Sequence, residues 1–306
     1  MAFEWKGVFP ALLTPFTPDE KLDLDMFEKN LAAQVEAGIH GIIIGGSLGE
    51  ASTVTEKEKE ELVEFSVEYL NEDIPVIMNI AESTTIDAIK QADNARKWGA
   101  DGIMLLPPMR YKTDDRETIT YFKAVANSTE LPIMIYNNPH DYKIDCRPEM
   151  FDELVECANI TALKESSRDV TNLTRMKNRF GERIKVLCGV DTLAMEELCL
   201  GADGWVAGLV DAFPKETVAI YNLVKAGKIE EATRIYRWFM PLLELDVHSK
   251  LVQYIKLAAT QTGIGSEYVR APRLMLAGKE RERILKIIND GIASRPAIKP
   301  MDAFAH

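Results

Sequence analysis

Short apolar runs alternate with longer segments of helical period along most of this chain of 306 residues. The apolar runs have the length of strands buried on both faces, and the segments between them have the spacing of amphipathic helices. Such alternation is typical of repeated strand–helix units around a parallel sheet. We therefore expect strands at 7–13, 41–46, 75–81, 102–107, 132–136, 160–165, 184–189 and 204–210, and helices at 23–37, 55–71, 84–98, 115–127, 148–157, 170–180, 192–200 and 214–226.

The joint between a helix and the next strand is repeated as Gly38-Ile39-His40-Gly41, Gly99-Ala100-Asp101-Gly102 and Gly201-Ala202-Asp203-Gly204. The first glycine of each joint can take the left-handed conformation that ends a helix, and the second allows the chain to enter a crowded strand. Reuse of one joint favours a closed, pseudo-symmetric (β/α)8 TIM barrel. An open doubly wound sheet would be favoured by a G-x-G-x-x-G turn after the first strand, which runs instead into Leu12-Leu13-Thr14-Pro15-Phe16.

The alternation of strands and helices ends after Gly227. Three expected helices follow one another there without a strand, at 228–245, 250–262 and 280–292. We therefore expect three parts of the chain: a barrel over 1–227, a C-terminal helical extension packed on it over 228–295, and an irregular tail over 296–306.

The charge balance disfavours some classes of partner. The 36 Lys and Arg residues against 48 Asp and Glu give a formal net charge of −12, which disfavours sequence-independent binding to nucleic acid or to an anionic membrane surface. Residues 1–10 lack the long apolar run of a signal peptide, and no stretch reaches the ~18 apolar residues of a transmembrane helix. The cysteines form no C-x-x-C pair, so we expect free thiols and a cytoplasmic location; they are Cys146, Cys157, Cys188 and Cys199.

Polar residues at the carboxyl ends of the strands are the candidates for chemistry, because the active site of a (β/α)8 barrel forms there. Lys164 lies near the end of the expected strand 160–165, after an apolar run. A desolvated lysine loses its charge and becomes nucleophilic, as imine formation with a ketone requires. From this strand alone the favoured interpretation is different, namely that Lys164 meets solvent and pairs with Glu165.

Two neighbouring strands add further candidates. Tyr136 ends the expected strand 132–136, one strand away from Lys164, where its phenol can relay protons to a lysine-bound substrate; a core tyrosine with a satisfied hydroxyl is the alternative. The strand at 41–46 leads into Gly45-Gly46-Ser47-Leu48-Gly49-Glu50, where backbone N–H groups and the Ser47 hydroxyl can face a carboxylate. Such a turn alone is a weak indication, and it lacks the G-K-[ST] ending of a nucleotide P-loop.

Four motifs in this order and spacing resemble the dihydrodipicolinate synthase and N-acetylneuraminate lyase family: Ala11-Leu12-Leu13-Thr14-Pro15-Phe16, Gly46-Ser47-Leu48-Gly49-Glu50, Tyr136-Asn137-Asn138-Pro139 and Lys164-Glu165-Ser166. The resemblance implies a (β/α)8 barrel with a C-terminal helical region, usually a homotetramer. It also implies a Schiff base between a lysine and a 2-oxo acid, formed without metal or organic cofactor. Carried over by motif, Lys164 forms the imine, Tyr136 relays protons, and Gly46, Ser47 and Leu48 face the substrate carboxylate.

Departures from the family's pattern bear on the substrate. Dihydrodipicolinate synthases of the common type have two adjacent threonines in the loop, whereas Leu48 at the second position has no hydroxyl. Met109 stands where a second tyrosine is expected after the fourth strand. The arginine that would hold a second carboxylate after the Tyr-Asn-x-Pro motif is missing, since His140, Asp141 and Tyr142 stand there. These departures disfavour the lysine-biosynthetic condensation.

What remains resembles the catabolic branch of the family, dehydratases and deaminases of 2-oxo-3-deoxy sugar acids or of the cyclic imine derived from hydroxyproline. The pyrroline-hydroxycarboxylate deaminase type is the most similar. In these reactions imine formation at C2 acidifies the C3–H, and a hydroxyl or amine two carbons from the imine leaves. His140 and Asp141 are expected to hydrogen-bond to hydroxyls of such a substrate, and Val206 is a further expected substrate contact.

Two kinds of alternative stay open. Within the family, the alternative is a 4-hydroxy-tetrahydrodipicolinate synthase or a 2-oxo acid aldolase. Outside it, a non-catalytic small-molecule-binding barrel would keep the carboxylate loop but would not need Lys164 and Tyr136, both of which are present. We expect no metal and no organic cofactor, and the expected partners are a small 2-oxo acid or cyclic imine and further copies of the chain.

Overall fold

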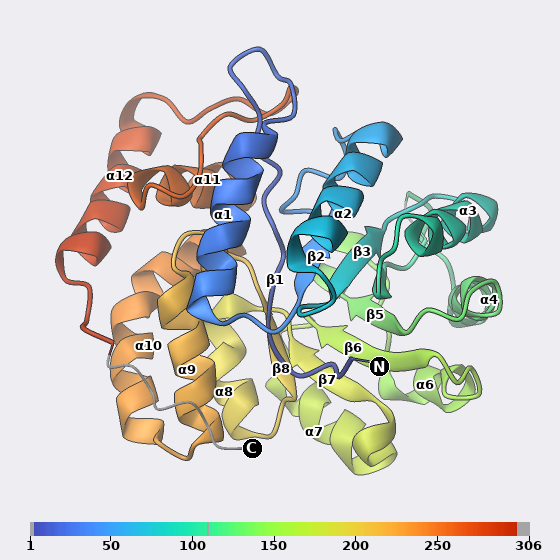
Figure 1. Ribbon diagram of the computed structural model, residues 1–306. Coiled ribbons are helices and arrows are strands. Elements are labelled where there is room, and N and C mark those ends of the chain that lie inside the picture. The colour runs from blue at the N-terminus through green and yellow to red at the C-terminus, as the bar shows by residue number, and fades with distance from the viewer. Residues whose placement is uncertain (1–2, 109, 299–306) are drawn as a thin grey trace.

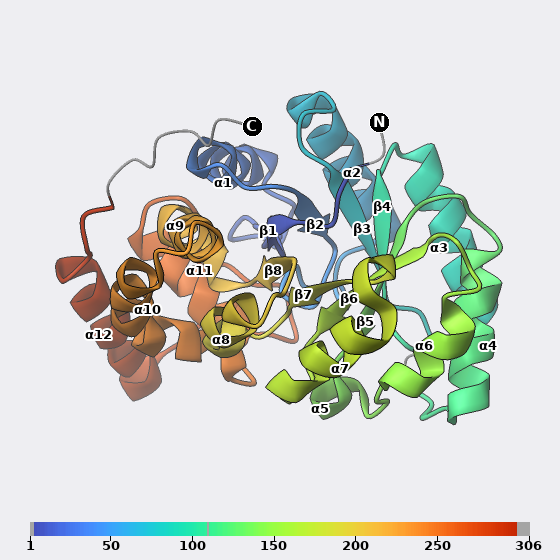
Figure 2. The same cartoon turned by 90° about the horizontal axis from the view of Figure 1, so that it is seen from below.

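The computed structural model describes residues 3–108 and 110–298. Eight parallel strands form one sheet in the order β1-β8-β7-β6-β5-β4-β3-β2, and helices surround it (Figure 2). Nearly all strand residues are buried, as in parallel sheets covered by helices. The strands are β1 (Gly7–Pro10), β2 (Ile42–Ile44), β3 (Val76–Ile80), β4 (Gly102–Leu105), β5 (Ile133–Asn137), β6 (Ile160–Glu165), β7 (Lys185–Cys188) and β8 (Gly204–Ala207).

The two ends of this strand order lie next to each other. Ala11, directly after β1, forms a parallel bridge with Ile43 of β2, and the Leu12 N–H donates to the Ile43 carbonyl at 2.9 Å. On its other side β1 pairs with β8, where Val8 lies opposite Trp205. The sheet is thus a nearly closed ring, and the expected (β/α)8 barrel is confirmed.

Helices alternate with the strands along the chain (Figure 1). Side chains fix several of their starts: Thr55 and Asp114 each accept a hydrogen bond from the third residue of the helix, whose glutamate side chain accepts from the cap's own N–H. The helices of the barrel are α1 (Leu24–Ala37), α2 (Glu56–Leu70), α3 (Thr85–Lys97), α4 (Asp115–Ala126), α5 (Pro139–Tyr142), α6 (Pro148–Leu154), α7 (Val170–Phe180), α8 (Ala194–Cys199) and α9 (Pro214–Lys225).

The repeated glycine joint has the expected geometry. Its first glycine takes a left-handed conformation at all three positions, with φ of 83° at Gly38, 84° at Gly99 and 101° at Gly201. At two of the three joints the second glycine lies where a side chain would clash: a Cβ atom at Gly41 would lie 2.1 Å from Cε1 of Phe9, and one at Gly204 would lie 2.4 Å from the Gly7 carbonyl oxygen. The joint therefore serves both helix termination and close packing of the barrel wall.

Three helices follow α9: α10 (Ile229–Leu243), α11 (Leu251–Gln261) and α12 (Gly278–Ala293). They lie together on one side of the barrel, α10 against α9 and α12 against both α10 and α11 (Figure 1). A short 3-10 segment, η4 (Glu244–Val247), connects α10 to α11, where we had expected one continuous helix to 245. The boundaries of barrel, extension and tail stay predictions, and residues 299–306 of the expected tail lie outside the described residues.

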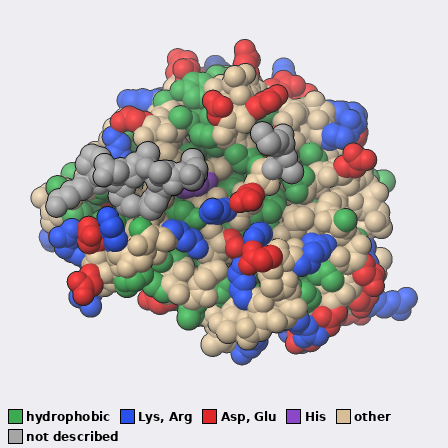
Figure 3. Space-filling model, turned by 60° about the horizontal axis from the view of Figure 1, so that its bottom comes forward, with side chains coloured by type: hydrophobic (Ala, Val, Ile, Leu, Met, Phe, Trp, Pro, Cys, Tyr) green, Lys and Arg blue, Asp and Glu red, His purple; other side chains and the backbone are tan. Residues whose placement is uncertain are grey.

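Six of the eight observed strands are shorter than the apolar runs that predicted them, whereas β6 has the expected bounds and β5 is shifted by one residue. Residues 11–13 are buried like β1, but the Leu13 N–H turns away from the sheet to the Asp211 carboxylate at 3.4 Å. No helix of the described residues is both long enough and apolar enough to span a membrane. Acidic and basic side chains are interspersed over the face shown in Figure 3.

Candidate active site

A pocket opens at the carboxyl ends of the strands, where the barrel fold predicts the chemistry. Its wall comes from the ends of several strands and from η4. Seven of the eight expected site residues line it together: Gly46, Ser47, Leu48, Tyr136, Asp141, Lys164 and Val206. His140 is not among the lining residues, because its Nε2 lies 3.0 Å from the Ser167 carbonyl oxygen.

Lys164 enters the pocket because of the alternation of side chains along β6. Its side chain is only 7% exposed, whereas Glu165 points to the opposite face, where it accepts hydrogen bonds from Asn137 at 3.2 Å and from Asn172. The interpretation of a solvent-facing Lys164 paired with Glu165 is therefore wrong. The strand instead delivers one buried amine to the pocket.

The surroundings of Lys164 favour its neutral form. Burial lowers the pKa of this amine to about 8, although the carboxyl groups of Asp246 and Asp191 act in the opposite direction. The Nζ atom lies 4.0 Å from the centre of the Tyr136 ring. A lysine in this state supplies far more unprotonated amine near neutral pH than an exposed one.

Tyr136 lies directly beside Lys164, because the two residues pair in the register of β5 and β6. Its hydroxyl accepts a hydrogen bond from the Asn138 amide at 3.2 Å, and burial raises its pKa to about 12. The Tyr142 ring meets the Tyr136 ring edge-on at 5.6 Å, and the hydroxyls of Tyr142 and Ser47 are hydrogen-bonded at 2.6 Å. The pocket therefore holds several hydroxyl groups next to the amine.

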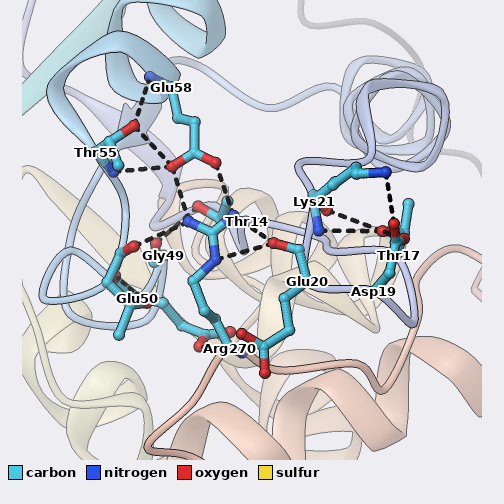
Figure 4. Close-up of polar contacts among 11 residues, drawn as sticks. Thr14, Thr17, Asp19, Glu20, Lys21, Gly49, Glu50, Thr55, Glu58 and Arg270 are labelled. Atoms are coloured by element: carbon cyan, nitrogen blue, oxygen red, sulfur yellow. Dashed lines mark hydrogen bonds and ion pairs between the residues drawn. The ribbon is translucent and has the colours of Figure 1, made fainter.

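The loop after β2 is held in place by its backbone and by distant side chains. Gly45 has a φ of 72°, and a Cβ atom at Gly49 would lie 2.8 Å from the Leu12 carbonyl oxygen, so glycine is required at both positions. The Thr14 hydroxyl donates to the Gly49 carbonyl at 2.7 Å (Figure 4). Leu48 is buried, whereas the Ser47 side chain is exposed to the pocket.

Residues from the C-terminal region complete this support. Arg270 forms two hydrogen bonds to Glu58, at 2.7 Å each, and also donates to the carbonyl oxygens of Glu20 and Thr53 (Figure 4). Lys256 forms a fully buried ion pair with Glu50, the last residue of the loop motif. The loop is thus anchored to the region after the barrel as well as to the barrel itself.

Asp141 is placed by the short helix α5. The Asn138 side chain caps this helix, and its amide also donates to Oδ2 of Asp141 at 2.7 Å. Asp141 and Tyr142 reach the pocket from there, while His140 points away. No helix is expected at 139–142 from the sequence, because a four-residue helix is too short for its periodicity to be detected.

Several pocket residues were not among the expected contacts, and three of them carry polar side chains that bear on the chemistry. Ser166 and Arg168 follow the end of β6, and their position just after the strand that carries Lys164 was the available indication. Asp246 comes from η4, and no pattern in the sequence links that segment to the pocket. Met109, which we had noted as a departure, lies outside the described residues. Among the residues that the structure describes, no group of His, Cys, Asp and Glu could hold a metal ion.

The fold and the pocket define a (β/α)8 lyase barrel with a buried amine at its catalytic end. Residues 4–290 match the model of the dihydrodipicolinate synthetase family. The chain belongs to this family, and it is a Schiff-base lyase.

Relatives and solved structures agree with this assignment. The chain is 31% identical over 290 residues to the 4-hydroxy-tetrahydrodipicolinate synthase of Kosmotoga olearia, covering 94% of this chain and 98% of the relative. It is 33% identical over 272 residues to the enzyme of the same name from Exiguobacterium sibiricum, covering 89% and 92%. The crystal structure of dihydrodipicolinate synthase from Thermotoga maritima superimposes with a TM-score of 0.89 at 26% identity, covering 95% and 99%.

The names of these relatives bear on the expected reaction. They carry the name of the synthase that we had kept as the alternative, so they favour that alternative over the dehydration or deamination expected from the departures. The family and the class of enzyme are confirmed at the coarser level.

Proposed function

We propose that Lys164 forms an imine with the C2 carbonyl of a 2-oxo acid or, by exchange, with a cyclic imine. The observation that carries this proposal is the buried amine itself: Lys164 faces the pocket without an ion pair to Glu165, and burial lowers its pKa to about 8. The amine attacks C2, water or the ring amine leaves, and the protonated imine then withdraws electrons from C3.

The neighbouring groups support specific roles in that reaction. Tyr136 lies in register with Lys164 and is proposed to take the C3 proton and return it, directly or through water. The loop residues Gly46, Ser47 and Leu48 are proposed to face the substrate carboxylate. Asp141 and Val206 line the same pocket and are proposed to contact the rest of the substrate. His140 is proposed to join them after its ring turns away from the Ser167 carbonyl oxygen.

For the substrate, we propose elimination from a C4-hydroxylated 2-oxo acid or from the related hydroxylated cyclic imine, with deamination following in the cyclic case. The support is the pair of acids in the pocket wall, Asp141 and Asp246. Their carboxyl oxygens can accept hydrogen bonds from hydroxyls or amines, and Asp141 disfavours a second carboxylate. Neutral or amine-bearing distal groups suit this wall best.

The second candidate is the synthase reaction, the condensation of pyruvate with an aldehyde that bears a carboxylate. Two observations favour it: the relatives named above are 4-hydroxy-tetrahydrodipicolinate synthases, and Arg168 lines the pocket, where its charge suits a second carboxylate. Arg168 does not stand at the position of the missing family arginine, but its presence in the pocket weakens one argument against condensation. The hydrogen-bonded hydroxyls of Ser47 and Tyr142 also offer a proton path.

A substrate panel separates the two candidates. Its members are 4-hydroxy-1-pyrroline-2-carboxylate, 2-oxo-3-deoxypentonate, and pyruvate together with aspartate semialdehyde. We expect turnover of at least one hydroxylated compound to exceed condensation by about 100-fold or more in kcat/KM, the scale set by hydrogen-bonding specificity. Efficient condensation without turnover of either hydroxylated compound would establish the second candidate instead.

The assembly and the cofactor requirement are further proposals. We infer that the enzyme works as a homotetramer without metal or organic cofactor, since the imine at Lys164 serves as the electron sink. The support for the assembly is the family resemblance together with exposed apolar side chains such as Leu274, which is 77% exposed, and Met275. Sedimentation velocity tests the assembly, and turnover after dialysis against EDTA tests the metal requirement.

A further inference from the structure

The segment after the barrel supplies a carboxyl group to the pocket. Asp246 lies in η4, between α10 and α11, yet its side chain lines the same pocket as Lys164 and Tyr136. The catalytic lysine and tyrosine stand on adjacent strands, so the extension adds a functional group that the strand ends do not provide.

Gly208 shows how closely this carboxyl group is packed against the barrel. A Cβ atom at Gly208, directly after β8, would lie 2.3 Å from Oδ1 of Asp246, so any side chain there would displace the carboxyl group. The Gly208 N–H donates to Asp191 at 3.2 Å. One glycine thus contacts two carboxyl groups, and a wider residue would separate Asp246 from the pocket wall.

The two carboxyl groups differ in their hydrogen bonds. Burial raises the pKa of Asp191 as well, but Asp191 accepts hydrogen bonds from the Trp205 indole at 2.9 Å and from the Leu209 N–H at 2.8 Å, which act in the opposite direction. No N–H group in the described part of the chain donates to Asp246. Burial, together with the neighbouring Asp191, raises the pKa of the Asp246 carboxyl, so this group is suited to hold a proton.

The other acid of the pocket, Asp141, is held in place by a neighbouring side chain. Its Oδ2 accepts a hydrogen bond from Asn138, which also caps the helix that carries Asp141. This contact fixes the position of the Asp141 carboxyl group. Arg168 lines the pocket as well, and its charge attracts the carboxylate that remains when Asp246 loses its proton.

We propose that Asp246 is the general acid that protonates the departing hydroxyl when the C4–O bond of the lysine-bound substrate breaks; this inference rests on the elimination proposed above. The base takes the proton from C3, and the electron pair of that bond forms the C3–C4 double bond as the C4–O bond breaks. The hydroxyl leaves as water with the Asp246 proton. Exchange with solvent then returns a proton to Asp246 and removes one from the base, so that the net change is loss of water.

The test compares two leaving groups. Fluoride can leave without being protonated, whereas a hydroxyl group needs a proton in order to leave as water. The probes are 4-hydroxy-1-pyrroline-2-carboxylate and its 4-fluoro analogue, and fluoride release follows the second. We expect Asp246→Asn to lower kcat on the hydroxy compound by about 100-fold, and on the fluoro compound by less than about threefold. Imine trapping with pyruvate and borohydride should persist in Asp246→Asn, because Lys164 is unchanged.

Glu244→Gln is the matched control, because Glu244 lies in the same segment but is exposed and does not line the pocket. It should change neither rate more than about twofold. Equal loss of both rates in Asp246→Asn would assign Asp246 a positioning role and overturn the proposal, as would no loss at all. Wild-type enzyme that traps pyruvate but turns over neither probe would contradict the elimination itself, and the role of Asp246 with it.

Discussion

At the scale of single residues, the chemistry depends on the protonation state of the Lys164 amine in the pocket. Lys164 is a nucleophile only when unprotonated, and its burial in β6 makes the charged form unfavourable. Tyr136 covers it from the neighbouring strand, with its ring centre 4.0 Å from Nζ. The Asp191 carboxyl group acts in the opposite direction and raises the pKa of Lys164.

The first prediction concerns the pH dependence of imine formation. With the pKa of Lys164 lowered to about 8, the neutral amine is the minor form below that pH and the major form above it. The rate of borohydride trapping at low pyruvate concentration should therefore rise with pH and level off above about 8. An inflection near pH 10, the ordinary pKa of a lysine, would show that burial does not lower the pKa of Lys164.

The second prediction separates imine formation from proton transfer. Tyr136→Phe should still be trapped by pyruvate and borohydride, because the amine remains, but its turnover should fall about 100-fold, the scale of one positioned acid–base group. Tyr121→Phe is the control, since Tyr121 is a buried tyrosine of α4 whose hydroxyl has no hydrogen-bond partner among the described residues. Unchanged turnover in Tyr136→Phe would move the relay to another group, such as the hydroxyl pair of Tyr142 and Ser47.

At the scale of elements, the loop after β2 depends on contacts from the C-terminal region. Glu50 ends this loop in a left-handed conformation, with a φ of 55°, and its carboxylate is held by Lys256 and by the Arg270 N–H at 3.2 Å. The Lys256 amine also donates to the Tyr268 carbonyl at 2.6 Å. These contacts connect α11 and the segment after it to the loop proposed to bind the carboxylate.

The third prediction tests this buried ion pair. Lys256→Met removes the nearer cation of the buried Glu50 and leaves Arg273 at 3.6 Å, and loss of one partner of a buried pair costs up to about 3–5 kcal/mol of unfolding free energy. Lys286→Met is the control, because Lys286 pairs with Asp290 on an exposed helix face, where the cost is at most about 0.5 kcal/mol. Urea denaturation at one protein concentration measures both, and similar small losses would mean that the buried pair does not stabilise the loop.

The elements were predictable to different degrees. Strand and helix alternation and the repeated glycine joint were enough to predict the barrel, because both reflect local conformation and the burial of a parallel sheet. The short helix α5 and the segment η4 were not predicted, since each is about one turn long and carries no period. Asp246 lies in η4 and could not be found either. In addition, its place in the pocket follows from how α10 and α11 pack on the barrel, which no local pattern reveals.

At the scale of the whole molecule, the barrel and the helices after it form one site. The strand ends supply Lys164 and Tyr136, whereas η4 supplies Asp246 and α11 supplies the lysine that holds the loop. The strand-end residues could be predicted from the barrel rule and from the family resemblance. The contribution of the extension depends on contacts between residues some 200 positions apart, such as Glu50 with Lys256, which no local pattern reveals.

The central claim is tested most directly by locating the trapped imine. The enzyme is incubated with pyruvate and borohydride, digested, and the modified lysine identified by mass spectrometry. Lys256 is an internal control, because burial also lowers its pKa to about 8 but it lies in the ion pair with Glu50, outside the pocket lining. We predict that the added mass lies on Lys164 alone and that Lys164→Arg abolishes it, whereas modification of Lys256 or any other lysine in its place would contradict the assignment of this site.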